Sequence, residues 1–142
     1  MEIVHDIRLT YQQVSELLSQ FIEAFPSLSE RVDIEQYSIK LSDNAFFILA
    51  CMDRRIVGFI AYYKDYVQKV VYIPLIAVDG SFRGKGIGGT MLDVLFESNV
   101  FISFIRLEVL KNNKRAFRFY MQQGFSVIED RKDCLLLEKV LC

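Results

Sequence analysis

The chain has 142 residues, of which 52% are hydrophobic, and its formal net charge is −1. This length is the usual size of one domain, and we expect a single domain over residues 1–142. With 12 Phe and 7 Tyr the chain can bury a sizeable core, which excludes disorder of the whole chain. The near-neutral charge indicates no nucleic-acid partner, and no apolar run is long enough to predict a membrane span or membrane partner.

The N-terminal segment has acids and no apolar run of the signal-peptide kind, so we expect a cytoplasmic protein. The three cysteines, Cys51, Cys134 and Cys142, fit neither a zinc pattern nor a disulfide framework, and we predict no metal site. Cys51 and Cys134 lie in apolar runs, so we interpret them as core residues rather than nucleophiles.

The first part of the chain predicts a strand and two helices. Residues 3–9 have the pattern of a strand. Thr10 and Gln13 then form a capping-box pattern that begins a helix, whose apolar face extends to Phe25 before Pro26 ends it. A shorter helix is expected over residues 33–41.

Three apolar, β-rich runs follow, separated by short breaks, at residues 45–52, 56–63 and 67–78. Short breaks predict hairpins, so these strands should be antiparallel. Pro74 removes a backbone donor from the third run, which favours an edge strand or a bulge at that point.

After a glycine-rich segment the pattern predicts a helix at 87–98, a strand at 101–110 that is apolar on both faces, a helix at 113–123, and strands at 125–129 and 134–141. This order predicts an α/β (α+β) fold. Its sheet is mixed and mostly antiparallel, with one parallel crossover and helices on both faces.

The glycine-rich segment follows a strand and opens a helix. The first amides of a helix have no acceptor within it, and the helix dipole adds partial positive charge there. Glycines allow close approach and left-handed backbone, and basic side chains add charge. The segment is therefore interpreted as a phosphate-binding loop made of Arg83, Gly84, Lys85, Gly86, Ile87 and Gly88.

Two other phosphate-binding patterns can be compared with this loop. A Walker A loop does not fit, because the spacing from Gly80 to Gly84 is one residue too short. The dinucleotide fingerprint does match, through Gly84, Gly86 and Gly89, with Glu108 at about the position of the ribose-binding acid. Against it, Asp79–Arg83 separate the strand from the loop, and a doubly wound sheet needs more than one crossover. An NAD-type binding domain stays as the alternative.

The chain resembles the GNAT superfamily of acetyl-CoA-dependent N-acetyltransferases in two motifs. Ile76–Asp79 followed by Arg83-x-x-Gly86-x-Gly88 is similar to the family's Arg/Gln-x-x-Gly-x-Gly/Ala signature. The second motif comprises Leu107-Glu108-Val109, Asn113-x-x-Ala116, Tyr120 and Gly124-Phe125. The resemblance covers about residues 72–125, and the elements on either side match the GNAT order more loosely.

The resemblance implies that acetyl-CoA is the co-substrate. It would lie in a V-shaped gap between the strand ending at Val78 and the strand ending near Leu110. Backbone groups of Ile76 and Val78 would bond the pantetheine arm, and the amides of residues 83–88 would hold the pyrophosphate. Asn113 matches the family's second cofactor-contacting motif.

The implied reaction is direct transfer of the acetyl group to a primary amine of a small molecule. Tyr120 is the candidate general acid for the leaving thiolate, since helical spacing puts it on one face with Asn113. A backbone N–H near Ile76 or Val78 is the candidate oxyanion donor. Glu108 is the nearest candidate base; a water relay or an amine of low pKa would serve instead.

The acceptor is less defined. Tyr62, Tyr63, Tyr66 and Tyr72 could line its site or be ordinary strand aromatics. Residues 32–41, with Tyr37 and Lys40, resemble a segment of acetyltransferases from sugar-modifying clusters, which implies an amino sugar. Protein N-termini, amino acids and polyamines stay open, as do a homodimer and a non-catalytic CoA-binding sensor.

Overall fold

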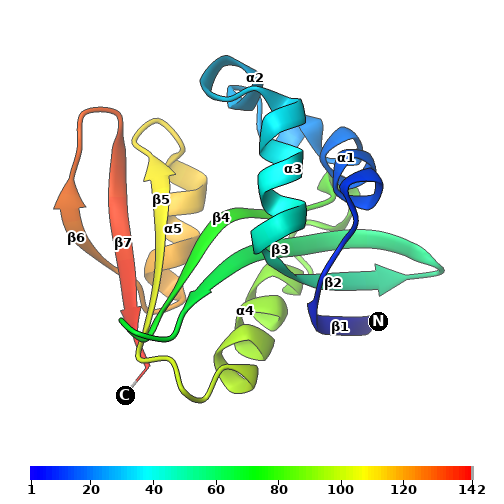
Figure 1. The fold of residues 1–142 in the computed structure, drawn as a ribbon. Helices are drawn as coiled ribbons and strands as arrows, with labels where there is room; N and C mark the ends of the chain where they lie inside the picture. The colour runs from blue at the N-terminus through cyan, green and yellow to red at the C-terminus, as the bar shows by residue number, and fades with distance from the viewer. Residues whose placement is uncertain (142) are drawn as a thin grey trace. The chain divides into compact units, whose positions relative to one another are not determined.

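The computed structural model describes residues 1–141, and its strands form one mixed sheet in the order β1-β2-β3-β4-β5-β7-β6 (Figure 1). The strands are β1 (Glu2–Ile7), β2 (Phe46–Met52), β3 (Arg55–Asp65), β4 (Val70–Val78), β5 (Phe104–Leu110), β6 (Ser126–Asp130) and β7 (Cys134–Val140). The main helices are α1 (Tyr11–Gln20), α2 (Leu28–Arg31), α3 (Ile34–Asn44), α4 (Ile87–Ser98) and α5 (Lys114–Gln122). The predicted mixed α/β fold is confirmed, with β4 and β5 parallel and α4 as their crossover helix. Cys142 lies outside the described residues.

The chain divides into two compact units. The first comprises Met1–Tyr62 and Leu75–Ser98, and the second comprises Tyr63–Pro74 and, of the described residues, 99–141. Strands β3 and β4 contribute residues to both units.

In the first unit helices cover both faces of the sheet, with α1 and α3 on one side and α4 on the other (Figure 1). The contacts of two adjacent residues of β3, Gly58 and Phe59, illustrate this arrangement. The ring of Phe59 meets that of Phe21, at the end of α1, edge-on with centroids 5.2 Å apart. Gly58 faces the other way, toward α4. A Cβ built on Gly58 would lie 3.3 Å from Ile87 Cγ2 and 3.1 Å from the carbonyl oxygen of Ala77. Glycine at this position therefore lets the start of α4 lie close to β3 and β4.

The first two long helices begin where the sequence predicts. Thr10 and Gln13 form the capping box of α1, and the Asp33 side chain accepts the Gln36 N–H at the start of α3. The expected extension of α1 to Phe25 is wrong, because the helix ends at Gln20 and gives way to a 3-10 turn and then α2. The residue before a proline avoids the helical region, as Phe25 does, and the four-residue α2 is too brief to show a periodic pattern.

In the second unit α5 covers one face of the sheet. The buried residues of β5 are Ile105, Leu107 and Val109. On the neighbouring strand β7, Lys139 pairs with Ile105 and so lies on the same face. Its Nζ donates to the carbonyl of Gln123, just beyond the end of α5, at 2.8 Å, which places α5 on this face. Even-numbered residues point to the other face, where Arg106 pairs with Glu138 at 2.7 Å. The expectation that this strand is apolar on both faces is wrong. That pattern included Phe101–Ser103, which precede the strand.

Strand β4 lies between β3 and β5, so the edge-strand alternative for Pro74 is wrong. Its parallel register with β5 includes Val70 opposite Phe104 and Ile73 opposite Leu107, directly before Pro74. A bulge at Pro74 stays a prediction. Within residues 1–141, no helix combines the length and the apolarity that a membrane span requires.

Candidate functional site

The start of α4 differs from the starts of the other long helices. In α1, α3 and α5 a side chain of Thr, Asp or Asn accepts one of the first backbone N–H groups. The residue before α4 is Gly86, which has no side chain to do so, and the helical ladder begins with the Thr90 N–H bonded to the Gly86 carbonyl at 3.0 Å. The amides of Ile87, Gly88 and Gly89 therefore have no helical acceptor. The first turn also carries no acidic residue, so nothing there repels an anion.

The loop before α4 has the backbone that the sequence predicts. Gly84 and Gly86 have φ angles of +80° and +76°, a region that residues with a side chain rarely adopt. A Cβ built on either glycine would meet no heavy atom within 4 Å. The space on the Cβ side of Gly84 and Gly86 is therefore open, and glycine keeps it so. The predicted left-handed role of Gly88 is wrong, because Gly88 lies inside α4.

Two cations flank Phe82 at this loop. Lys85 Nζ lies 5.4 Å from the centroid of the ring, and the Arg55 guanidinium lies 5.5 Å from it. Arg55 also pairs with Asp79 at 3.1 Å. The Asp79 pKa is lowered, mainly by a hydrogen bond from the Ser81 amide and further by Arg55. Sequence reasoning missed Arg55, since it lies on the β2–β3 hairpin and outside every motif.

Strand β4 leads into this loop and ends at Val78. Ile76 and Val78 are half-buried and lie two residues apart, so their side chains share a face of the strand. The Asp79 N–H donates to the carbonyl of Val57 at 2.8 Å, which ties the beginning of the loop to β3.

Tyr120 is buried on the sheet side of α5. Its ring packs edge-on against Phe125, with centroids 5.5 Å apart. Burial raises the pKa of Tyr120, and no charge or hydrogen bond from the described residues contributes to the shift. The hydroxyl therefore keeps its proton across the physiological pH range.

Asn113 has a structural task. Its side-chain oxygen accepts the Ala116 N–H at 3.1 Å, so Asn113 caps α5 and lies outside the helix that was predicted to include it. The helical-spacing argument that joined Asn113 to Tyr120 is therefore wrong, because the Asn113 backbone is not helical.

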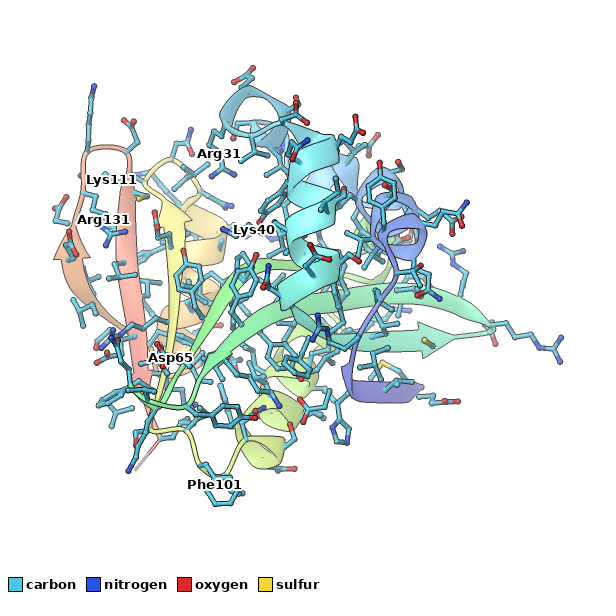
Figure 2. All side chains as sticks on the ribbon, viewed as in Figure 1. Arg31, Lys40, Asp65, Phe101, Lys111 and Arg131 are labelled. Atoms are coloured by element: carbon cyan, nitrogen blue, oxygen red, sulfur yellow. The ribbon has the colours of Figure 1, made fainter. Side chains whose placement is uncertain are left out.

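Glu108 accepts contacts from three donors on the polar face of β5. Cys134 Sγ lies 2.8 Å, Arg131 Nη1 3.0 Å and Tyr72 Oη 3.2 Å from its carboxylate oxygens. The hydrogen bond from Cys134 contributes most to lowering the Glu108 pKa. Figure 2 shows Arg131 on the β6–β7 hairpin, and Arg131 also pairs with Glu129 at 3.0 Å. A carboxylate held ionised in this way is a weak base.

The structure does not bring Glu108 and Tyr120 together. Glu108 lies on the polar face of β5, whereas α5 with Tyr120 packs against the opposite, buried face. A proton acceptor and a proton donor at these positions would approach a reacting group from opposite sides of the sheet.

Other residues singled out by the sequence have different surroundings. Cys134 is half-exposed rather than part of the core, and burial and Glu108 raise its thiol pKa to about 11, so it is no nucleophile. The Cys51 pKa is also raised, mainly by burial. Tyr62 is buried and donates to the Asp6 carboxylate, which makes it a core residue. His5 is exposed on the edge strand β1.

A model of the acetyltransferase (GNAT) family matches residues 11–125, which include the loop, α4, β5 and α5. No curated protein matches the chain by sequence.

Solved structures of GNAT acetyltransferases have similar folds. One from Staphylococcus aureus Mu50 has a TM-score of 0.76 at 19% identity over 99% of both chains. The PaiA N-acetyltransferase of Thermoplasma acidophilum, in complex with coenzyme A, has a TM-score of 0.75 at 20% identity over 99% of both chains. One from Elizabethkingia anophelis, with acetyl-CoA bound, has a TM-score of 0.66 at 21% identity over 74% of this chain and 82% of that one.

Proposed function

The chain belongs to the acetyltransferase (GNAT) family, and from this premise we propose that it transfers an acetyl group to a primary amine of a small molecule. Enzymes of this family are acyltransferases that use acetyl-CoA as the donor. The amine and the roles of individual residues are the proposed part.

The observation that carries the proposal is the uncapped start of α4. Acetyl-CoA has a diphosphate, and the open amides of residues 87–89 together with the left-handed Gly84 and Gly86 fit such an anion. Arg83 and Lys85 add positive charge. We assign the pyrophosphate to residues 83–88 and the pantetheine arm to the backbone of Ile76 and Val78. Asn113, whose amide nitrogen is left over from capping, is kept as a further cofactor contact.

Tyr120 is the proposed general acid. When bound, the co-substrate supplies a thioester whose sulfur leaves as a thiolate. The Tyr120 hydroxyl, kept protonated by burial, can donate to that sulfur. An ordinary thiol has a pKa of about 8.5, below that of a phenol, so full proton transfer is uphill. The hydroxyl therefore acts mainly by hydrogen bonding as negative charge develops.

Glu108 is the proposed partner of the acceptor amine. Its low pKa makes it poor at removing a proton from an ammonium group, but an ionised carboxylate binds and orients that group well. One proton of the ammonium passes to solvent water before attack, which frees the lone pair of the amine, and the second proton lost by the nitrogen ends on the leaving thiolate. The half-buried ring of Tyr72 beside it offers an apolar surface. A carboxylate next to an aromatic ring suits an amino sugar, which has both an amine and apolar C–H faces, so amino sugars are the first class to test.

The test begins with ligand binding. Acetyl-CoA and CoA at a hundredfold excess over their dissociation constants should each raise the stability by about 2.7 kcal/mol, whereas NAD and NADP should not. A comparable shift with NAD alone would support the dinucleotide alternative. An amine screen that reads free CoA then separates an enzyme from a non-catalytic sensor, which would bind CoA and release none with any acceptor.

A further inference from the structure

The hairpin between β2 and β3 holds a cation against the loop before α4. Asp53 and Arg54 have φ angles of 49° and 65°, and Met52 pairs with Arg55. Two consecutive left-handed residues make a tight two-residue hairpin turn. Because such a turn fixes the strand that leaves it, the position of Arg55 is set by the backbone.

Arg55 is also held by the loop itself. Its Nη2 donates to Asp79 at 3.1 Å, and its guanidinium lies 5.5 Å from the Phe82 ring. The side chain is still 57% exposed, and within residues 1–141 no other hydrogen bond is found for it. Nε and Nη1 therefore have no hydrogen-bond partner among residues 1–141, and the contacts with Asp79 and Phe82 orient the side chain.

The loop thus has positive groups at both ends. The open amides of residues 87–89 lie at its end, whereas Arg55 is anchored at its beginning, on Asp79 and Phe82. Lys85 makes a second cation–π contact with the Phe82 ring. One diphosphate satisfies the amides and leaves Arg55, which has donors beyond the one that Asp79 uses, without a phosphate. Coenzyme A carries one further phosphate, the monoester on its ribose 3′ oxygen.

We infer that Arg55, oriented by Asp79 and Phe82, binds the ribose 3′-phosphate and lets the protein distinguish coenzyme A from its 3′-dephospho form. The inference rests on the proposed function, since it assumes that the diphosphate occupies the start of α4. A guanidinium offers two parallel donors to a phosphate, and a monoester phosphate has close to two negative charges at neutral pH.

Isothermal titration of CoA and 3′-dephospho-CoA tests this directly. The wild type should bind CoA roughly two- to fivefold more tightly, as expected of an exposed ion pair. Arg55→Gln should reduce the ratio of the two affinities to about one, mainly by weakening the binding of CoA. Arg54→Gln is the matched control, because Arg54 has the same charge in the same turn, and among residues 1–141 no hydrogen bond or ion pair joins it to the loop. This variant should keep the wild-type ratio of the two affinities. Added salt should lower the ratio of the two affinities in the wild type, because salt screens the attraction between Arg55 and the 3′-phosphate.

The possible failures are distinguishable. If Arg55→Gln weakens both compounds equally, Arg55 only orders the loop, and the inference is wrong. Equal binding of both compounds by the wild type also overturns it and leaves the proposed function intact. If the wild type binds neither compound, the proposed function itself fails. Should Arg55→Gln not fold, Arg55→Lys keeps the charge without the paired donors and should give an intermediate ratio.

Discussion

Substitution of Gly58 tests the packing that places the start of α4. A Cβ at this position would lie 3.1 Å from the Ala77 carbonyl oxygen, 3.1 Å from Met91 Cε and 3.3 Å from Ile87 Cγ2. The methionine end can move, but the Ala77 oxygen belongs to the sheet backbone and cannot. Overpacking of a core costs about 1–3 kcal/mol, and replacing a strand glycine returns about 0.5–1 kcal/mol. We expect Gly58→Ala to lower the free energy of unfolding by about 1–2 kcal/mol, and Gly58→Val by roughly 3 kcal/mol or more.

Urea unfolding measures this loss as a lower midpoint at an unchanged slope. In a thermal scan Gly58→Ala should lower Tm by about 3–6 °C. The matched control is Gly80→Ala, because a Cβ on Gly80 meets nothing within 4 Å and its φ is not positive; its change should stay within about 0.5 kcal/mol. If Gly58→Ala is as stable as the wild type, α4 does not pack as closely as described and the reasoning is refuted.

Three further predictions concern the loop and the titrating groups. Gly86→Ala should cost about 1–2 kcal/mol of stability through its left-handed φ. It should also strongly weaken the binding of acetyl-CoA in isothermal titration, because the methyl group would occupy the open space beside Gly86 that we assign to the diphosphate; unchanged affinity would contradict the phosphate assignment. Tyr120→Phe should keep acetyl-CoA affinity within a few-fold and lower kcat by about 10²–10⁴, whereas a rise in KM alone would make Tyr120 a binding residue. Because the Glu108 pKa is lowered in the folded state, its contribution to stability is present above the ordinary carboxyl pKa and lost as pH falls through the folded value. Urea midpoints of wild type and Glu108→Gln should therefore converge in acid, and a constant difference down to pH 2 would contradict this.

Much of the fold could be predicted because local patterns and tertiary structure agree. The capping box at Thr10, the glycine loop and the helix from Ile87 to Ser98 each depend on neighbouring residues, and the structure has them where the sequence places them. Errors occurred where local signals stop. The four-residue α2 has no measurable period, and residues 101–103 are apolar although they lie in a loop.

Only those parts of the candidate site that are formed by neighbouring residues of the sequence could be predicted. The glycines and Tyr120 could be found by motif, but the donors around Glu108 come from β4, β7 and the β6–β7 hairpin. Arg55 reaches Asp79 across 24 residues of sequence. No local pattern encodes such contacts, because they exist only once the sheet order is formed. For the same reason Cys134 was interpreted as a core residue, since its apolar sequence neighbours do not reveal the carboxylate opposite it.

The missing side-chain cap of α4 has a consequence for the life of the protein in a cell. The first turn of a helix without a side-chain cap frays more readily until an anion accepts its amide hydrogens, and in the proposed complex the diphosphate of acetyl-CoA would be that anion. Proteolysis of such a protein depends on the population of opened molecules, which falls as the ligand concentration rises above its dissociation constant. We therefore expect that the protein is degraded faster when acetyl-CoA is scarce, so that its abundance follows the supply of its own donor.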